Sequence, residues 1–455
     1  MLFKLKGIEK LHLVGIGGSG MSGLAEILIS MGFKITGSDI KKTEVTERLE
    51  KLGCKIYYNH SPLNVREANL VIISSAIKEN NPEVREARRL HIPVIRRLEM
   101  VAELTRTKYS ICISGAHGKG TVTSMTAKIM EEAGLSPTIM IGGIIKGFST
   151  GSFLGKSEFL VAEVDESDKY FLNLFPTIAV VTNIDREHLD TYKNLNGVKR
   201  AFKEFLKRVP FYGCVIINGE DKNLMEIVKD IKKKVITFGF SEKFDIHPKD
   251  LKIESNYSIF EIRYNGEKVR IKINIPGKHN VLNALASIAV AYELKISPNI
   301  IKKALEEFKG MQRRFEFKGE KNGIGWLDDY AHHPTEIRET LITCKNFWKK
   351  GRVIAVFQPH RYTRTYYLFK DFAKPLSIAD IVFLLPIYPA GEKKIKGVKS
   401  KLIYDEIKKI KKEVYLVNEK NLEERIKKII KKGDLIVSLG AGDVWKIVKN
   451  IFEKL

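Results

Sequence analysis

A glycine-bounded loop that carries a lysine offers the clearest chemistry in the chain. It follows a short apolar run typical of a strand and precedes apolar residues at helical spacing. A strand, a glycine loop and a helix start direct backbone N–H groups and the helix dipole at phosphate oxygens, and Lys119 adds a full positive charge. The pattern predicts phosphate binding rather than a glycine-rich helix start without function. The loop consists of Gly115, Ala116, His117, Gly118, Lys119, Gly120 and Thr121.

Two positions of this loop depart from the common phosphate-binding pattern G-x-x-x-x-G-K-[ST]. Ile113 stands where the pattern has its first glycine. Gly120 stands where a hydroxyl would hold Mg²⁺, and Thr121 comes one residue later, about 100° further around a helix.

A second glycine-rich loop lies near the start of the chain. It follows a predicted strand at Leu11–Val14, opens a helix and has the spacing G-x-G-x-x-G, and Asp39 ends the next strand about 20 residues on. This pattern predicts binding of a diphosphate and a ribose, so NAD and a nucleotide sugar such as a UDP-sugar both fit. The candidate residues are Gly15, Gly17, Gly18, Ser19, Gly20, Met21 and Ser22.

Polar side chains also end the next two predicted strands. Ser74 follows Leu70–Ile73, at the edge where open α/β sheets bind ligands. Arg97 follows Ile92–Ile95, where it could be part of a surface pair or a clamp on a diphosphate.

The segment after the lysine loop carries candidates for a metal site. Glu163 lies on a predicted strand, Phe159–Val164, where a carboxylate beside a phosphate loop suits Mg²⁺. His188 stands among acidic residues beyond another strand, as a second metal ligand or merely a hydrogen-bonded histidine.

The turn Asn265-Gly266 between alternating runs predicts a hairpin. A helix is expected after it, with two asparagines at its start, Asn280 and Asn283.

The last part of the chain again alternates strands and helices, which predicts an α/β fold throughout. A composition shift near Gly310 indicates a linker that includes Arg314. Predicted strands at 325–327, 353–357, 381–384, 414–417 and 435–439 end in polar clusters. Two adjacent histidines could suggest a metal, but neighbours in the chain point apart. The polar residues singled out are Asp329, His332, His360, Arg361 and Arg364.

Bulk composition narrows the classes of partner. A length of 455 residues predicts two to four domains. The net charge of +24 is spread over helix faces without interleaved aromatic residues, which favours anionic small molecules over nucleic acid. Four scattered cysteines fit a reducing compartment. No membrane-length apolar run or signal peptide is evident, so we expect a cytoplasmic protein without membrane partners.

A series of motifs runs along this chain. In order, the motifs are GIGGSGMSG, GAHGKG, AEVDESD, TNIDREHLD, GKHNVLNALA, RRFEFKG, DDYAHHPTEI, QPHRYTRT and LGAGDVWK. Together they resemble those of the Mur ligase family. The resemblance covers nearly the whole chain and implies three domains. Residues 1–107 would form a Rossmann-like domain for a UDP-sugar, and 108–310 a central P-loop ATPase domain. Residues 311–455 would form a C-terminal Rossmann-like domain that closes over ATP and an amino acid.

The resemblance implies an ATP- and Mg²⁺-dependent ligase, a monomer or homodimer, that joins L-alanine to the lactyl carboxylate of UDP-N-acetylmuramate. The first glycine loop with Asp39, Ser74 and Arg97 would bind the UDP-sugar. Lys119 would bind the transferred phosphate, and Glu163, His188 and Thr121 the metal. ATP would also contact Asn280, Asn283, Arg314 and Asp329, while His332, His360, Arg361 and Arg364 would receive the amino acid.

One departure from the family pattern leaves alternatives open. The family has threonine or serine at the position of Gly120, and usually threonine at that of Ala116. Water could replace the missing hydroxyl, Thr121 could substitute, or the metal site could be weakened. The rival interpretations are a ligase that recycles murein peptides, an NAD-dependent dehydrogenase, and a nucleotide-sugar binder without activity.

Overall fold

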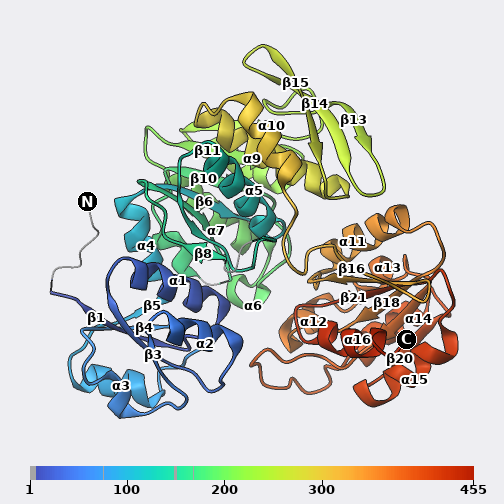
Figure 1. Ribbon diagram of the computed structural model, residues 1–455, viewed down its shortest axis with the longest axis horizontal. Coiled ribbons are helices and arrows are strands. Elements are labelled where there is room, and N and C mark those ends of the chain that lie inside the picture. The colour runs from blue at the N-terminus through green and yellow to red at the C-terminus, as the bar shows by residue number, and fades with distance from the viewer. Residues whose placement is uncertain (1–6, 75, 148–150, 168) are drawn as a thin grey trace.

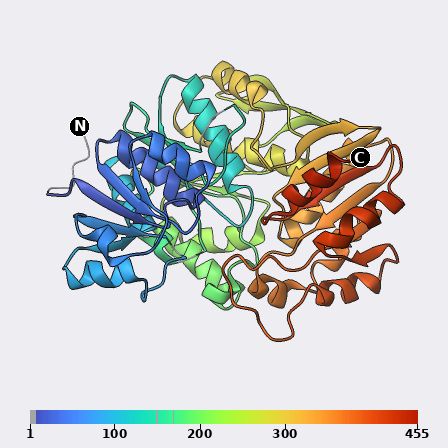
Figure 2. The ribbon, with the colours of Figure 1, turned by 60° about the horizontal axis from the view of Figure 1, so that its bottom comes forward.

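The computed structural model describes residues 7–74, 76–147, 151–167 and 169–455. Ser75 and Asp168, in two polar strand-end segments, lie outside these ranges. For Ser19 the backbone is described and the side chain is not. Within the described residues the strands form four sheets, of five, seven, three and six strands. They build three α/β bodies, and two views place the central body beside each of the others (Figures 1 and 2). The predicted α/β class is confirmed.

The first body is a parallel sheet with the strand order β3-β2-β1-β4-β5. The order reverses beside β1, which puts the first glycine loop at the switch point where such sheets bind ligands. The strands are β1 (Lys10–Val14), β2 (Lys34–Ser38), β3 (Lys55–Tyr57), β4 (Leu70–Ile73) and β5 (Val94–Arg96). The helices are α1 (Ser19–Ser30), α2 (Glu44–Lys51), α3 (Pro82–Arg89) and α4 (Arg97–Thr107), with a 3₁₀ turn at Pro62–Val65.

The central body has the strand order β12-β11-β10-β6-β9-β7-β8, with β6 in the middle of the sheet. Its strands are β6 (Tyr109–Ser114), β7 (Thr138–Met140), β8 (Ser152–Phe153), β9 (Phe159–Glu163), β10 (Ile178–Val181), β11 (Cys214–Asn218) and β12 (Lys234–Phe238). Its helices are α5 (Lys119–Glu132), α6 (Leu189–Tyr192), α7 (Leu195–Lys207), α8 (Lys222–Ile227), α9 (Lys278–Glu293) and α10 (Pro298–Glu307). Helix α5 packs on α9 and α10. Two 3₁₀ turns lie at Lys169–Asn173 and Val228–Asp230.

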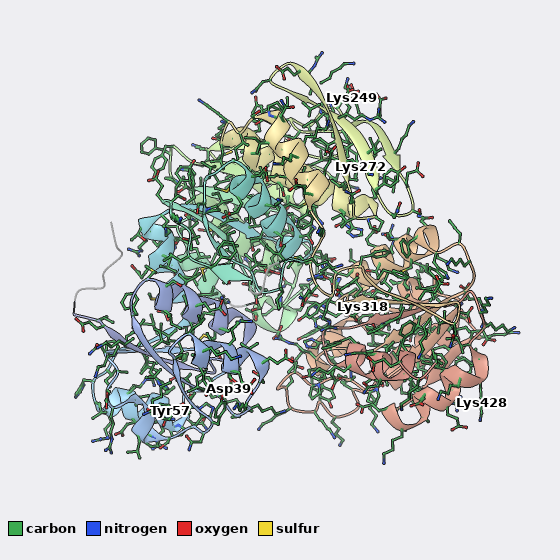
Figure 3. All side chains as sticks on the ribbon, in the orientation of Figure 1. Asp39, Tyr57, Lys249, Lys272, Lys318 and Lys428 are labelled. Atoms are coloured by element: carbon green, nitrogen blue, oxygen red, sulfur yellow. The ribbon has the colours of Figure 1, made fainter. Side chains whose placement is uncertain are left out.

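A small antiparallel sheet extends from the central body. It consists of β13 (Lys249–Ile253), β14 (Ser258–Tyr264) and β15 (Glu267–Ile273). The predicted hairpin is confirmed, because β14 and β15 pair through a turn in which Asn265 and Gly266 both have positive φ. Figure 3 labels Lys249 and Lys272 on this sheet, and Lys318 and Lys428 on the third body.

The third body has the strand order β16-β17-β21-β18-β19-β20, parallel except for β16. Its strands are β16 (Glu316–Lys321), β17 (Ile324–Asp329), β18 (Val353–Phe357), β19 (Ile381–Leu384), β20 (Val414–Leu416) and β21 (Leu435–Leu439). Its helices are α11 (Pro334–Phe347), α12 (Tyr362–Leu368), α13 (Ala373–Leu376), α14 (Lys401–Lys408), α15 (Glu419–Ile429) and α16 (Val444–Phe452).

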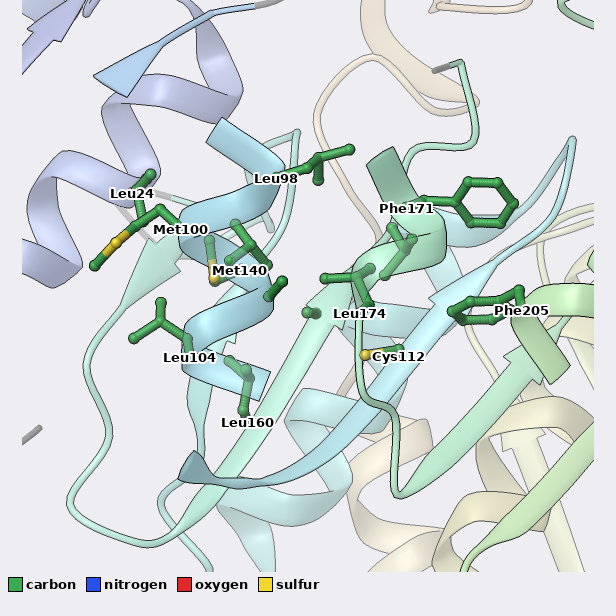
Figure 4. Packing of buried hydrophobic residues seen from close by; sticks show 14 of the residues in the cluster. Leu24, Leu98, Met100, Leu104, Cys112, Met140, Leu160, Phe171, Leu174 and Phe205 are labelled. Carbon is green, nitrogen blue, oxygen red and sulfur yellow. The ribbon is translucent and has the colours of Figure 1, made fainter. Parts of the chain in front are cut away.

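The first two bodies share one apolar core. Leu24 of α1 and Leu98 and Leu104 of α4 belong to the same buried cluster as Cys112 of β6 and Phe205 of α7 (Figure 4). Glycine permits the close approach, because a Cβ on Gly23 would lie 2.3 Å from Ser152 Oγ of β8. The third body instead has its own buried clusters. None of the helices in the described ranges is long and apolar enough to span a membrane.

Candidate active site

The lysine loop is held in a conformation that requires its glycines. Gly115 and Gly118 have φ values of +131° and +83°. A Cβ on Gly115 would lie 2.2 Å from Thr182 Oγ1, and one on Gly118 would lie 2.5 Å from Asn283 Oδ1. The loop leaves β6 after Ser114, and α5 begins at Lys119. The strand therefore delivers the loop directly to the N-terminus of a helix, where phosphate binds well.

Lys119 is largely buried beneath this loop. Its Nζ donates to Gly115 O at 2.5 Å and Ala116 O at 3.3 Å, and lies 2.9 Å from Glu166 Oε2. Burial lowers the pKa of Lys119, but Glu166 and neighbouring carboxylates outweigh burial and raise it above its ordinary value. Burial also raises the pKa of Glu166. The lysine is thus a largely buried cation that is paired with a carboxylate.

The predicted metal ligands lie on two sides of Lys119. Glu163, at the end of β9, accepts a hydrogen bond from Gly142 N at 2.7 Å. His188 instead groups with Asp165 and Glu166, and their ligand atoms lie within 4.8 Å of one another. Both Glu163 and Glu166 raise the pKa of Lys119, so both carboxylates act on the same cation. In the described part of the chain, oxygen donors suited to Mg²⁺ therefore flank the loop.

The loop residues 120 and 121 face different surroundings. A Cβ on Gly120 would lie 3.6 Å from Glu163 Oε1 and 3.3 Å from Met311 Sδ. Thr121 lines the cavity between the central and third bodies. The position that lacks a hydroxyl is consequently the one that faces Glu163, and Met311 of the interdomain linker packs beside it.

A cavity of about 680 Å³ lies between the central and third bodies, within the size range of ligand sites. Its lining brings together these predicted residues: His117, Gly118, Thr121, Asn280, Asn283, Arg314 and Asp329. The cavity also has apolar walls, Phe238 and Phe240, which sequence reasoning missed because they end an otherwise ordinary strand. His279, also missed, lines it with an unpartnered Nδ1, and burial lowers the pKa of His279 to about 4.

Residues of the linker and third body close one side of this cavity. Arg314 lies 3.7 Å from Glu336 Oε1 and 5.1 Å from the ring centre of Tyr330. Asp329 accepts hydrogen bonds from Phe315 N at 2.9 Å and Ala331 N at 2.7 Å, and burial raises the pKa of Asp329 to about 6. Asp329 therefore holds the linker and the start of the next loop.

A second polar cluster spans the same two bodies. Arg364 of α12 donates to both carboxylate oxygens of Glu187, at 3.3 and 3.2 Å, and lies 3.2 Å from His360 Nδ1. The rings of His332 and His360 are 5.7 Å apart. Burial lowers their pKa values, to about 3 for His332 and about 2 for His360, so both are neutral near pH 7. Arg361 and His188 line a small pocket beside Arg364.

The first glycine loop collects its own predicted partners. Gly17 N donates to Asp39 Oδ2 at 2.9 Å, so this carboxylate braces the loop. A Cβ on Gly15 would lie 2.8 Å from Ser74 Oγ, and one on Gly20 would lie 3.0 Å from the guanidinium carbon of Arg97. Met21 and Ser22 are buried in the first turn of α1, and Gly18 precedes that helix.

A buried carboxylate beneath this loop was not predicted. Glu83, fully buried, accepts from Ser38 Oγ at 2.8 Å and Asn64 Nδ2 at 2.7 Å, and contacts His60 Nδ1 at 2.6 Å and His12 Nε2 at 3.3 Å. The carbonyl of Ser38 accepts hydrogen bonds from Gly15 N and Ile16 N. Glu83 therefore anchors the strand end that holds the loop. A lone glutamate on an amphipathic helix gives no sequence signal of this.

Two phosphate-type loops, a buried lysine among carboxylates and an interdomain cavity define a multidomain nucleotide-binding enzyme. Three family descriptions match in order: Mur ligase family, catalytic domain, at 10–109; Mur ligase middle domain at 113–291; and Mur ligase, glutamate ligase domain, at 313–442. The chain belongs to the Mur ligase family.

Similar proteins match over almost the full length. The UDP-N-acetylmuramate–L-alanine ligase of Geotalea daltonii is 48% identical, and that of Geobacter sulfurreducens 45%, each alignment covering 98% of both chains. The crystal structure of UDP-N-acetylmuramate-alanine ligase from Thermotoga maritima has a TM-score of 0.82 at 32% identity, covering 98% of both chains. A murein peptide ligase from Psychrobacter arcticus shares the fold, with a TM-score of 0.74 at 23% identity.

Proposed function

We propose that this protein is an ATP-dependent ligase that joins L-alanine to the lactyl carboxylate of UDP-N-acetylmuramate in peptidoglycan precursor synthesis. One observation supports the proposal most strongly. Lys119, the cavity around Asn283 and the cluster around Arg364 all lie where the central and third bodies adjoin. Relatives that bear this name are 45–48% identical over nearly the whole chain.

We assign the substrates to three places. The UDP diphosphate lies on the first glycine loop with Arg97, and ATP lies in the interdomain cavity with its phosphates at Lys119. L-alanine lies near Arg364 and Arg361, because guanidinium groups pair well with carboxylates. The domains proposed are 1–107, 108–310 and 311–455.

The proposed reaction has two steps. An oxygen of the lactyl carboxylate attacks the γ-phosphorus of ATP, which breaks the bond to ADP and gives an acyl phosphate. The ammonium group of L-alanine first gives one proton to a base, and the free amine attacks the acyl carbon. The C–O bond to phosphate then breaks, and the second proton of the nitrogen passes to the leaving phosphate. Lys119 offsets the negative charge of the transferred group. We assign the base to His360 or His332, whose low pKa values in the empty site must rise when anionic substrate groups bind beside them.

The residues around Lys119 also fit Mg²⁺. Glu163 on one side, and Asp165, Glu166 and His188 on the other, offer the oxygen and nitrogen donors. When bound there, the ion would neutralise charge on the phosphates. Because Gly120 offers no hydroxyl, the carboxylates and His188 would hold the ion, with Thr121 or water in place of the missing hydroxyl.

Phosphate release is the deciding measurement. Purified protein with Mg²⁺, ATP and UDP-N-acetylmuramate is expected to release phosphate with L-alanine, and much less with glycine, L-serine or the recycled tripeptide. A preference for the tripeptide would favour the recycling ligase, and no release would favour a non-catalytic binder. Size-exclusion chromatography tests the proposed monomer or homodimer. Because ATP and UDP-sugars are intracellular metabolites, we propose a cytoplasmic site of action.

A further inference from the structure

His117 of the lysine loop reaches across to the third body. Its Nε2 is 2.9 Å from Asp185 Oδ2, which belongs to the central body. Its Nδ1 is 3.3 Å from Glu336 Oε1, which belongs to α11 of the third body. The imidazole thus lies between two carboxylates, one from each body.

Each partner of this bridge is attached by hydrogen bonds to its own body. The backbone of His117 is held at the end of β10, because its N–H donates to Asn183 Oδ1 at 2.9 Å and its carbonyl accepts from Thr182 Oγ1 at 2.6 Å. Glu336 in turn accepts from His332 N at 3.0 Å. The imidazole is therefore carried by the loop of the central body, and the carboxylate by the start of α11 in the third body.

The surroundings keep the bridge charged. Burial lowers the pKa of His117, but Asp185 and Glu336 outweigh burial and raise it to about 9. The ring of His333 lies 4.7 Å away, and Thr335 Oγ1 donates to Asp185 Oδ2 at 2.7 Å. Arg314 Nη1 lies 3.7 Å from the same Oε1 of Glu336. Asp185 therefore receives a contact from each body.

We infer that His117 is a positioning residue that couples the lysine loop to the docking of the third body. In a docked molecule the imidazole contacts both carboxylates. When the third body moves away, the imidazole keeps Asp185 and loses Glu336. The geometry of the loop that carries Lys119 therefore depends on whether the amino acid side of the site is closed.

Such coupling has a chemical use in the proposed reaction, on which this inference rests. An acyl phosphate formed in an open site would be hydrolysed, since water competes with the amine. A loop that reaches its working geometry only in the docked state delays phosphoryl transfer until water is excluded. Loss of the bridge should therefore waste ATP as well as slow the reaction.

The test is a double-mutant cycle with His117→Gln and Glu336→Gln. Each single variant is expected to lower kcat about tenfold or more, because it removes one partner of a buried ion pair, with KM for ATP changed less than about threefold. Phosphate released per alanyl product should rise above one in both. The double variant should be no slower than the slower single variant, because both changes remove the same contact.

Two further variants separate coupling from structural damage. Asp371→Asn removes the carboxylate of an exposed pair with Arg186 that also joins the two bodies, at 3.5 Å, and should leave kcat and the phosphate-to-product ratio unchanged. Glu336→Asp keeps the charge and should restore part of the activity. Effects that multiply in the double variant, or a phosphate-to-product ratio of one in both single variants, would overturn the inference.

Small-angle X-ray scattering in solution tests the inference independently of which amino acid is the substrate. With a non-hydrolysable ATP analogue, the native chain should become more compact, and the His117→Gln and Glu336→Gln chains should do so less. This result does not depend on alanine being the amino acid. Equal compaction in all three chains would overturn the inference even if the ligase activity is confirmed.

Discussion

The two glycine loops of this protein share a backbone design and differ in their side chains. Each follows a central parallel strand and starts a helix. The first loop is braced by Asp39 of its own body, and its nearby cation, Arg97, comes from another helix. The second contains its own lysine, is flanked by carboxylates, and contacts the third body through His117. The backbone suffices to hold a diphosphate, whereas transfer of a phosphoryl group needs the added charges and a closing body.

The largest expected difference between the loops is the effect of removing Lys119. Lys119→Met should lower kcat for phosphate release about a thousandfold, because the transferred charge loses its fixed cation. Calorimetry should show binding of UDP-N-acetylmuramate within about twofold of the native value, since the first loop is separate. Equal weakening of both ligands would contradict the separation of roles.

Removal of Asp39 should weaken the use of UDP-N-acetylmuramate and leave that of ATP nearly unchanged. The expected effect is smaller than that of removing Lys119. Asp39→Ala leaves Gly17 N without its acceptor and should raise KM for UDP-N-acetylmuramate about tenfold, the value of a hydrogen bond to a charged group. KM for ATP should stay within about twofold in the same steady-state assay. Asp39→Asn keeps an acceptor and is expected to lie between the alanine variant and the native chain.

The buried carboxylate beneath the first loop, Glu83, should contribute to stability in a way that depends on pH. Hydrogen bonds from His12, Asn64, Ser38 and His60 outweigh burial and lower the pKa of Glu83 below its ordinary 4.5. Its stabilising contribution is therefore present above pH 4.5 and is lost as the pH falls through the lowered pKa. Glu83→Gln should reduce stability by about 1–3 kcal/mol near pH 7.

Thermal unfolding monitored by circular dichroism checks this expectation. The gap in Tm between native and Glu83→Gln proteins should narrow as the pH falls below 4.5. A gap that stays constant down to pH 3 would contradict the assigned role of Glu83.

The smallest expected effect concerns the missing hydroxyl of the second loop. Gly120→Thr places a hydroxyl near Glu163 after a small shift of the flexible Met311 side chain. It should lower the Mg²⁺ concentration for half-maximal activity by about fivefold, the value of one neutral contact. Gly120→Ala adds bulk without a ligand and serves as the matched control. Superimposable Mg²⁺ titrations for all three chains would contradict the expectation.

Much of the fold could be predicted because buried strands carry continuous apolar runs. The predicted bounds of β4, β18, β19 and β21 agree with the structure residue for residue. Short or polar edge strands such as β3 and β16 were missed, because exposed positions weaken the pattern. The apolar strand β11 was also missed, although its sequence carries the signal.

The residues of the candidate site could be predicted from the sequence, whereas the contacts between their side chains could be predicted less well. Strand ends in parallel sheets meet at one edge, so Asn283, Arg314 and Asp329 could be expected near one ligand. The contact between His117 and Glu336 could not, because it depends on how two separately folded bodies dock. The same holds for Met311 beside Gly120, since no local pattern indicates which linker side chain packs there.

The apolar core that α1 and α4 share with the central sheet affects how the chain loses its structure. Separating these two bodies would expose Leu24, Leu98 and Leu104 to water, so neither can unfold while the other keeps its packing. The third body has complete cores of its own, and it contacts the central body through ionic side chains, which water can solvate. We therefore expect the molecule to unfold in two cooperative units rather than three. The boundary between them runs through the cavity where the nucleotide is proposed to bind.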